Sequence, residues 1–308
     1  MDVIKRDSDM FFKRPLGVGL GNFDGIHIGH MSLINILINE CKLNNFHSMI
    51  YTFENHPDNI IKGKMVTPLL FTTEKKTEIL STLALDYLFY EKFDEAFSKL
   101  EPEEFVKNIL IDFLNIKLAV VGFDYNFGYK GRGNADLLKQ LSTAYDFHVI
   151  VIPPIKVNDD IVSSTLIREI LACGDMSKVL YFLGRYYSIT GIVQEGNRIG
   201  AKLGFPTANI IPEDFLLLPP AGVYATRTLL NGRVFKSVTN IGDNPTIHNG
   251  NKKNKINIET HIIGFQENVY NKKIEVFFIS KIRDEEKFAS KEELSLRIKM
   301  DVLEAMKY

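Results

Sequence analysis

The spacing of apolar residues changes once along this chain of 308 residues, near Arg185. Upstream of that point, short runs rich in β-branched and aromatic residues alternate with segments of helical periodicity. The runs that we predict to be buried strands are 17–23, 48–53, 87–90, 118–122 and 148–152. Strands that alternate with helices form a parallel sheet covered on both faces, because each connection must cross over the sheet. Residues 1–184 are therefore expected to form an α/β domain.

Two of the intervening helices show clearly in their apolar spacing. After His30, apolar residues recur at 31, 34, 37, 38 and 41, which form one face of a helix. After Pro102 the same rhythm occurs at 105, 106, 109, 110 and 113, with the proline in the first turn, where it is tolerated. Both patterns predict helices that pack on the sheet.

Downstream of Arg185, the predicted strands are separated by Gly, Asn and Pro turns instead of helices. The strands are 187–193, 222–230, 235–241, 256–263 and 274–279. This pattern predicts a small antiparallel β-barrel in residues 185–308. Asn231 and Gly232 favour a tight hairpin between two strands, because both positions of that turn prefer φ > 0. Ser290 and Glu293 have capping-box spacing and predict a terminal helix.

The composition favours small-molecule partners. A formal net charge of −1 and a pI near 6.7 argue against a large basic surface for nucleic acid. No run approaches the roughly 20 apolar residues of a membrane span, and the N-terminus lacks the apolar region of a signal peptide. Cys41 and Cys173 lie among apolar helical residues, so we expect two buried thiols in a reducing cytoplasm. A monomer and a homo-oligomer both stay open.

The segment 21–30, GNFDGIHIGH, lies where a predicted strand gives way to a predicted helix. Gly21 and Gly25 let the backbone approach a triphosphate, and the free amides at a helix start favour anions. His27 and His30 can donate hydrogen bonds to oxygens that gain charge when a phosphate attacks the α-phosphorus of ATP. The alternatives are that the histidines cap and pack the helix or bind a metal, although no third zinc ligand is evident.

A second segment, VSSTLIR at 162–168, follows the last strand of the same domain. Its hydroxyls suit a helix N-cap, and Arg168 one turn later can point back toward a phosphate. Taken alone, this is an ordinary helix start. Its place after the last strand also allows it to close over a leaving pyrophosphate.

The segment 200–209, GAKLGFPTAN, has the composition of a second phosphate loop. Pro206 fixes the backbone before Thr207 and Asn209, which share a face of an extended strand. Such a pair can hold Mg²⁺ and a nucleotide phosphate through oxygen ligands. The alternative is a Pro/Gly turn that leads into a strand.

Transfer of phosphate to a hydroxyl also needs a base, and Glu259 is the leading candidate. In the predicted strand around it, Asn257, Glu259 and His261 face one way and the isoleucines face the other. The alternative is an exposed strand carboxylate, which is the commoner fate of a glutamate.

Six motifs in this order resemble the prokaryotic bifunctional riboflavin kinase/FAD synthetase family. They are GNFDGIHIGH, SSTLIRE, KLGFPTAN, AGVYA, NIGDNPT and the late RDEEKF, and the resemblance runs from about Leu16 to the C-terminal helix. The resemblance implies a nucleotidyltransferase-type Rossmann-like domain that adenylates FMN to FAD with release of pyrophosphate, in residues 1–184. It also implies a riboflavin kinase-like barrel that phosphorylates riboflavin to FMN, in residues 185–308, each with Mg²⁺ and ATP.

The same resemblance implies roles for individual residues. In the adenylyl transfer, His27 and His30 are expected to be catalytic. Contact with ATP or its phosphates is expected for Gly21, Asn22, Phe23, Gly25, Ser164, Thr165 and Arg168 in the first domain, and for Gly200, Lys202, Gly204, Thr207 and Asn209 in the second. Thr207 and Asn209 are also expected to bind the metal, and Glu259 to be the kinase base. Flavin contacts are expected for Asp124, Phe127 and Arg283.

Three alternatives to a fully bifunctional enzyme follow from the sequence. One is a paralogue with a single working module, and another is an enzyme that requires reduced flavin. The third is a flavin-sensing protein that has kept the folds and lost turnover, which predicts flavin binding without an ATP-dependent product. Retention of both histidines, Thr207, Asn209 and Glu259 disfavours the sensor.

Overall fold

The computed structural model describes the chain except residues 7–11, 13, 197–198, 214 and 249–250, and the side chains of 199, 202, 243–248 and 251–255 are not described. The chain divides into two compact units, Met1–Ser164 and Thr165–Tyr308. This division lies upstream of residue 184, because helices α7 (Ser164–Cys173) and α8 (Met176–Leu183) group with the second unit. There α8 packs on strand β16 (Lys273–Arg283).

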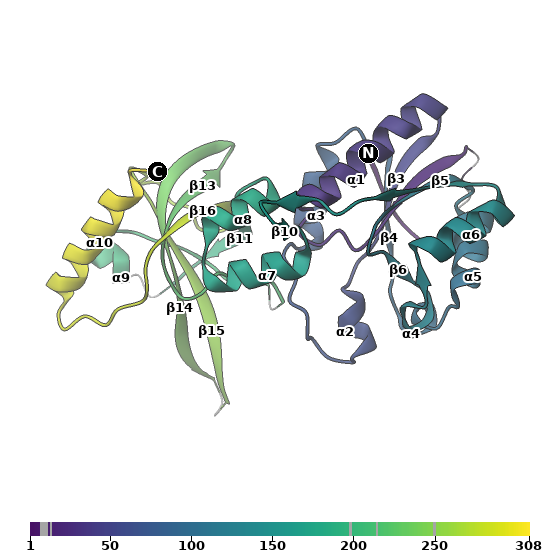
Figure 1. Ribbon diagram of the computed structural model, residues 1–308. Helices are drawn as coiled ribbons and strands as arrows, with labels where there is room; N and C mark the ends of the chain where they lie inside the picture. The colour runs from purple at the N-terminus through teal and green to yellow at the C-terminus, as the bar shows by residue number, and fades with distance from the viewer. Residues whose placement is uncertain (7–11, 13, 197–198, 214, 249–250) are drawn as a thin grey trace. The chain divides into compact units, whose positions relative to one another are not determined.

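The first unit contains a parallel sheet, as the sequence predicts (Figure 1), and it has six strands where five were predicted. In spatial order its strands are β1 (Asp2–Lys5), β4 (Tyr87–Glu91), β3 (His47–Phe53), β2 (Leu16–Leu20), β5 (Ile116–Gly122) and β8 (His148–Ile152). The edge strand β1 was not predicted, because it is short, polar and mostly exposed. The other five strands coincide with the predicted runs to within a few residues, except that 17–23 ends three residues too late.

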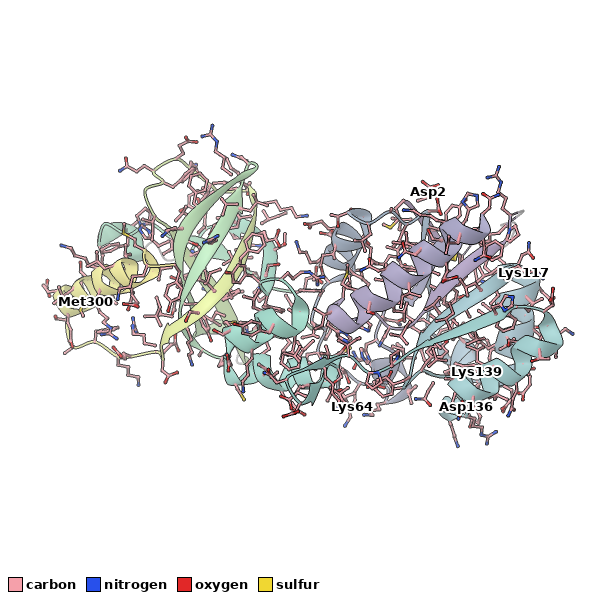
Figure 2. The ribbon with its side chains drawn as sticks, turned by 45° about the horizontal axis from the view of Figure 1, so that its top comes forward. Asp2, Lys64, Lys117, Asp136, Lys139 and Met300 are labelled. Carbon is pink, nitrogen blue, oxygen red and sulfur yellow. The ribbon has the colours of Figure 1, made fainter. Side chains whose placement is uncertain are left out.

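Helices cover both faces of this sheet. On one face lie α1 (Ile28–Asn44) and α3 (Thr73–Ser81). On the other lie α5 (Pro102–Glu104), the π-helical segment η1 (Phe105–Phe113) and α6 (Ala135–Tyr145). On α6, Leu138 is buried, while Asp136 and Lys139 point outward (Figure 2).

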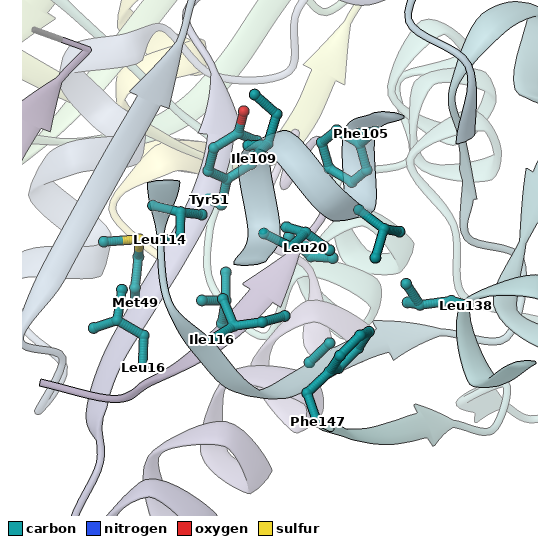
Figure 3. Close-up of a cluster of buried hydrophobic side chains, with 14 of the residues drawn as sticks. Leu16, Leu20, Met49, Tyr51, Phe105, Ile109, Leu114, Ile116, Leu138 and Phe147 are labelled. Carbon is teal, nitrogen blue, oxygen red and sulfur yellow. The ribbon is translucent and has the colours of Figure 1, made fainter. Parts of the chain in front are cut away.

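Close packing of α1 on β2 depends on two glycines. A Cβ at Gly17 would collide with the Cys41 sulfur, and one at Gly19 would lie 3.1 Å from Leu33. On the opposite face, the core contains large apolar side chains from the central strands and η1, among them Leu16, Leu20, Tyr51, Phe105, Ile109 and Ile116 (Figure 3). The smaller elements of this unit are α2 (Pro57–Ile61), α4 (Glu95–Ser98), the 3₁₀ turn η2 (Tyr129–Gly131), and the paired strands β6 (Asn126–Phe127) with β7 (Gly133–Asn134) and β9 (Lys156–Val157) with β10 (Asp160–Ile161).

The second unit contains a closed antiparallel barrel, which confirms the predicted architecture. In spatial order its strands are β11 (Ser188–Gln194), β12 (Ala208–Ile210), β15 (Asn251–Ile262), β14 (Arg233–His248), β13 (Gly222–Leu230) and β16. The three-residue β12 lies in the segment predicted to be extended around Thr207 and Asn209, and Thr207 comes just before it. Asn231 and Gly232 form the predicted hairpin, with φ of 50° and 76°.

The two faces of the barrel strands differ in chemistry. The interior contains a chain of buried hydroxyls joined by hydrogen bonds of 2.8–2.9 Å, made by Thr226, Thr228, Ser237, Thr239 and Thr260. On the outer face, Val223, Ala225 and Val238 pack against Ala305 of the terminal helix α10 (Lys291–Ala305). Ser290 caps α10, as predicted, by accepting from the Glu293 amide at 3.1 Å.

The two cysteines differ in exposure, and the prediction that both are buried is wrong for one of them. Cys41 is buried on α1, whereas Cys173 is exposed at the end of α7. The inward face of α7 is formed by Ile167 and Leu171, and Cys173 lies outside that face. Within the described part of the chain, no helix combines the length and the apolar character needed to cross a bilayer.

Candidate active sites

The loop that carries the two histidines lies at the point where the strand order of the sheet reverses. From β2 the chain proceeds to β3 on one side, whereas β5 pairs with β2 on the other side. In open parallel sheets, ligands bind outside the carboxyl ends of the strands at such a point. The loops after β2 and after β5 both begin at this edge, because the two strands are parallel neighbours.

The loop after β2 has an unusual backbone. Phe23 and Ile26 adopt left-handed φ of 47° and 40°, and Gly25 has φ of 80°. Each non-glycine residue in this region costs about 1–3 kcal/mol unless its surroundings hold it there. Both side chains are fully buried in the core beneath α1, which stabilises the turn. A Cβ at Gly21 would lie 3.2 Å from the Phe23 ring, so the glycine allows a tight start to the loop.

The two histidines stack at the start of α1. His27 is the N-cap residue, and its Nδ1 accepts from the His30 amide at 3.2 Å. The ring centroids lie 3.6 Å apart at an angle of 14°. Because Nδ1 of His27 accepts, the neutral ring carries its proton on Nε2, where it can act as a donor. Capping and catalysis are therefore compatible roles for this residue.

The underside of the loop is held by side chains from β3 and α3. The Asn22 carbonyl accepts from Thr52 Oγ1 and from Lys76 Nζ, both at 2.9 Å. Lys76 is only 7% exposed, and burial lowers its pKa to about 8. Asn22 therefore contributes its backbone oxygen to the support of the loop.

Asp24 anchors the middle of the loop. Its carboxylate accepts from the amides of Leu70 at 3.1 Å and Phe71 at 3.3 Å. Its carbonyl accepts from Ser164 Oγ at 2.9 Å. The structure thus gives Ser164 a supporting role in the loop, beside its predicted contact with phosphate.

Thr165 and Arg168 lie on α7, immediately after Ser164. Thr165 is exposed and Arg168 is half-buried, while Ile167 between them is fully buried. This alternation follows from the amphipathic character of the helix. Their contact with ATP phosphates stays a prediction.

The loop after β5 places its two predicted flavin residues differently. Asp124 is exposed, whereas Phe127 is 7% exposed. The Phe127 ring stacks on Tyr125 with centroids 5.6 Å apart, and a Cβ at Gly133 would lie 2.8 Å from it. Phe127 is thus a core residue in this structure, and its contact with flavin stays a prediction. Phe123 provides an exposed ring on the same loop.

In the barrel, the register brings Asn209 of β12 directly opposite Glu259 of β15. Directly opposed residues lie on one face of a sheet, and Asn240 of β14 is opposite Glu259 on its other side. The neighbouring pair of Ala208 and Thr260 belongs to the hydroxyl-lined interior. Asn209 and Glu259 therefore share the outer face of the barrel.

The Asn209 side chain has the features of a ligand for a hard cation. It is 6% exposed, and its Oδ1 has no hydrogen-bond partner among the described residues. A buried amide oxygen without a partner is unfavourable unless a ligand completes it. A Cβ at Gly196 would collide with the Asn209 amide nitrogen, so a glycine is needed beside it. With the Thr207 hydroxyl two residues earlier, the donor set fits Mg²⁺.

Glu259 has a perturbed carboxyl group. Burial raises its pKa above the ordinary glutamate value, and a hydrogen bond with Asn257 opposes the rise. A carboxylate with a raised pKa is a better proton acceptor near neutral pH. The environment of Glu259 therefore suits a general base.

The loop before Thr207 closes on the carbonyl of Gly200, which accepts from the amides of Leu203 at 3.0 Å and Phe205 at 2.8 Å. A Cβ at Gly200 would collide with the Phe205 carbonyl oxygen, and Gly204 has φ of 87°. Both glycines are therefore required by the loop geometry. Gly200 lies in the short helix α9 (Ile199–Lys202), and the side chain of Lys202 lies outside the described residues.

Arg283, at the end of β16, makes a buried bidentate ion pair with Asp301 of α10. Its Nε lies 3.0 Å from Asp301 Oδ1, and its Nη2 lies 2.8 Å from Oδ2. The two side chains are 10% and 4% exposed. The structure thus shows that Arg283 fixes the terminal helix, and its contact with flavin stays a prediction.

Comparisons with known proteins agree with this two-site geometry. The FAD synthetase family model matches residues 12–166, and the riboflavin kinase model matches residues 183–308. A bifunctional riboflavin kinase/FMN adenylyltransferase from Buchnera aphidicola subsp. Schizaphis graminum is 39% identical over 94% of this chain and 93% of its own. The chain belongs to the bifunctional riboflavin kinase/FMN adenylyltransferase family.

A second relative supports the assignment, and a solved structure supports the fold. The riboflavin kinase/FMN adenylyltransferase of Bacillus subtilis is 32% identical over 94% of this chain and 92% of its own. A crystal structure from Streptococcus pneumoniae, described as a macrolide-efflux protein, has a TM-score of 0.89 and 26% identity over 99% of both chains. As a family member, the chain is a transferase of flavin cofactor biosynthesis with kinase and nucleotidyltransferase activities.

The structure of this family member also brings in residues that the sequence reasoning missed. Lys76, Thr52 and Asp24 hold the histidine loop, although the sequence analysis gave none of them a role. One available signal was the position of Lys76 four residues before Leu80, on the buried face of α3. Asn240 was missed because strand neighbours in a barrel cannot be read from a single strand.

Proposed function

We propose that this family member carries out its two reactions at two separate sites, one at the histidine loop and one on the outer face of the barrel. The single observation that supports the kinase assignment is the pairing of Asn209 with Glu259, because one side chain has the chemistry of a metal ligand and the other that of a base. The stacked pair of His27 and His30 at a helix start carries the adenylyltransferase assignment.

In the kinase reaction, Glu259 accepts the proton of the terminal ribityl hydroxyl of riboflavin. The freed oxygen forms a bond to the γ-phosphorus of ATP while the bond to the β-phosphate oxygen breaks, which yields FMN and ADP. Thr207 and Asn209 would hold Mg²⁺, which when bound neutralises charge on the phosphates. The loop 200–206 contributes backbone amides and Lys202 to the phosphates.

In the adenylyl transfer, a phosphate oxygen of FMN attacks the α-phosphorus of ATP and pyrophosphate leaves. The nucleophile is already anionic, so no general base is required. His27 and His30 donate to oxygens that gain charge, and the amides at the start of α1 add to this stabilisation. Gly21, Asn22, Phe23 and Gly25 shape the loop that admits the triphosphate.

The contacts of the remaining predicted residues belong to the same proposal. Ser164, Thr165 and Arg168 act on the pyrophosphate side of the first reaction. Asp124 and Phe127 act on the flavin side of the first reaction, and Arg283 on that of the second.

The functional modules are taken as residues 1–184 and 185–308. This boundary places α7 and α8 with the adenylyltransferase, whereas packing groups them with the barrel. The proposed partners are ATP, riboflavin, FMN, FAD and pyrophosphate, with Mg²⁺ in both reactions. We expect a cytoplasmic location and no nucleic-acid or membrane partner. A monomer and a homo-oligomer both stay open.

The test is chromatographic product analysis of the purified chain with riboflavin, ATP and Mg²⁺, repeated with FMN and under dithionite. FMN followed by FAD is the expected result. A single product would show that one site assignment is wrong, and product only under dithionite would assign a requirement for reduced flavin. Tight flavin binding without any product would contradict the proposal in favour of a sensor.

A further inference from the structure

The turn between β2 and α1 is unfavourable on its own. Phe23 and Ile26 both adopt left-handed backbone conformations, which L-residues with bulky side chains rarely adopt. Such a conformation persists only where the surrounding structure determines it. The contacts that hold this turn therefore decide the shape of the adenylyl-transfer site.

Lys76 is the cation beneath this turn. Its Nζ donates to the Asn22 carbonyl at 2.9 Å and lies 3.4 Å from Thr52 Oγ1. Thr52 Oγ1 donates to the same carbonyl, so two donors converge on one backbone oxygen. Lysine is almost never this deeply buried unless a partner compensates it. Here that partner is the backbone of the loop, immediately before the left-handed residues.

We propose that Lys76 is a positioning residue for adenylyl transfer, and that its ammonium group holds the 22–26 turn in the shape that presents His27 and His30 to the triphosphate. This inference rests on the function proposed above for the histidine loop. Lys76 acts through the Asn22 carbonyl and not on the substrate, because its side chain is buried against the underside of the loop.

The groups that face the ammonium come from the elements packed around α3. Asp24 in the turn attracts it, and the Tyr90 ring of β4 lies 5.9 Å from Nζ. Burial raises the pKa of Tyr90, so that group stays neutral. On α3 itself, Lys75 is paired with Glu78 at 2.8 Å.

The protonation state of Lys76 makes the hold of its ammonium group on the Asn22 carbonyl depend on pH. Burial lowers the pKa of Lys76 to about 8, and the attraction of Asp24 opposes this shift. The ammonium form is therefore present below that pH and is lost above it. A hydrogen bond from a charged donor is roughly twice as strong as one between neutral groups, so the hold on Asn22 weakens as the proton leaves.

The first experiment measures FAD formation from FMN and ATP as a function of pH in wild type, Lys76→Met and Lys76→Arg. For Lys76→Met we expect kcat to fall by about 100-fold at pH 7, the size of effect that a small misplacement of catalytic groups produces. For Lys76→Arg we expect activity to persist above pH 8, where the wild type declines, because arginine keeps its charge. Riboflavin kinase activity of the same samples should stay within twofold and reports on the barrel, and thermal unfolding of each variant reports on the folding of the first unit.

Each result decides the inference. Wild-type failure to make FAD would overturn the proposed function, whereas wild-type kcat in Lys76→Met would overturn only the role of Lys76. An identical alkaline decline in wild type and Lys76→Arg would also overturn it. If the Lys76 variants do not fold, Thr52→Val decides the question. Loss of the Thr52 hydroxyl removes an acceptor beside the ammonium group, so the alkaline decline of FAD formation should move to lower pH. An unchanged decline would contradict the positioning role of Lys76.

Discussion

Asn209 and Glu259 are directly opposed across strands β12 and β15, so a buried amide oxygen and a half-buried carboxyl group project from the same outer face of the barrel. The Asn209 oxygen has the chemistry of a ligand for a hard cation, and the Glu259 carboxylate has that of a proton acceptor. The register of two adjacent strands fixes how the two side chains lie relative to each other, and a barrel holds this placement better than loops would. This relationship makes the kinase site the more sharply testable of the two.

Replacing Glu259 by Gln should lower kcat for FMN formation by about 10²–10⁴-fold, because general base catalysis has that size. The base acts when deprotonated, and burial raises the pKa of Glu259. Wild-type kinase activity should therefore fall with acid at a pH above the ordinary glutamate pKa, and Glu259→Gln should lose this acid limb. Rates from pH 4.5 to 8 check this. FAD formation from supplied FMN is the control, and its loss would show misfolding.

Replacing Asn209 by Ala should raise the Mg²⁺ concentration needed for half-maximal kinase rate, because it removes the oxygen that has no partner among the described residues. Asn209→Asp should restore the Mg²⁺ response, since a carboxylate is a stronger ligand. Titration of kinase rate with Mg²⁺ at fixed ATP measures both variants. An unchanged requirement in Asn209→Ala would remove Asn209 from the metal site.

The comparison of sequence and structure separates local from non-local information. Strand and helix runs, the Asn231-Gly232 hairpin and the Ser290 cap follow from patterns within a few residues, and the structure confirms them. The alternation of polar residues and isoleucines around Glu259 predicts which face of the strand carries its side chain. It could not give Asn209 and Asn240 as neighbours, because strand order in a barrel is a property of the whole chain.

The misses have particular physical causes. Lys76 was overlooked because lysines are normally solvated, and here the Asn22 carbonyl and the attraction of Asp24, both from a distant loop, compensate the charge. Phe127 and Arg283 lie in segments whose resemblance implies flavin contact, and the structure shows Phe127 in the core and Arg283 in a buried ion pair. One chain position can satisfy packing and chemistry together, and a motif does not separate the two.

Gly200→Ala should impair the kinase selectively. The added Cβ would collide with the Phe205 carbonyl oxygen, which forces the phosphate loop to shift. We expect a higher KM for ATP, with FAD formation unchanged. Gly232→Ala is the matched control: it has φ of 76° but nothing within 4 Å of the new Cβ, so it should cost about 1–2 kcal/mol of stability without raising KM. Equal effects on KM would contradict the loop assignment.

Asp301→Ala should destabilise the barrel by about 3–5 kcal/mol, because it leaves the Arg283 guanidinium buried without its bidentate acceptor. Urea unfolding followed by circular dichroism measures this. Glu304→Ala on the same helix removes an exposed ion pair with Lys307 and should change stability by less than about 1 kcal/mol. A similar small effect for Asp301→Ala would show that the Arg283 pair does not hold α10.

Substitutions at His27 separate its capping role from its chemistry. Asparagine is a favourable N-cap residue, so His27→Asn should keep the start of α1 and lose only the imidazole, whereas His27→Ala should also lose about 0.5–2 kcal/mol of stability. We expect both variants, and His30→Ala, to reduce FAD formation at least about 100-fold, the cost of losing a donor to developing charge. FMN formation from riboflavin should persist in all three. If His27→Asn makes FAD at the wild-type rate while His27→Ala does not, the histidine is a helix cap and the transfer depends on His30 and the backbone amides. If all three variants lose FMN formation as well, the assignment of the two reactions to separate sites is wrong.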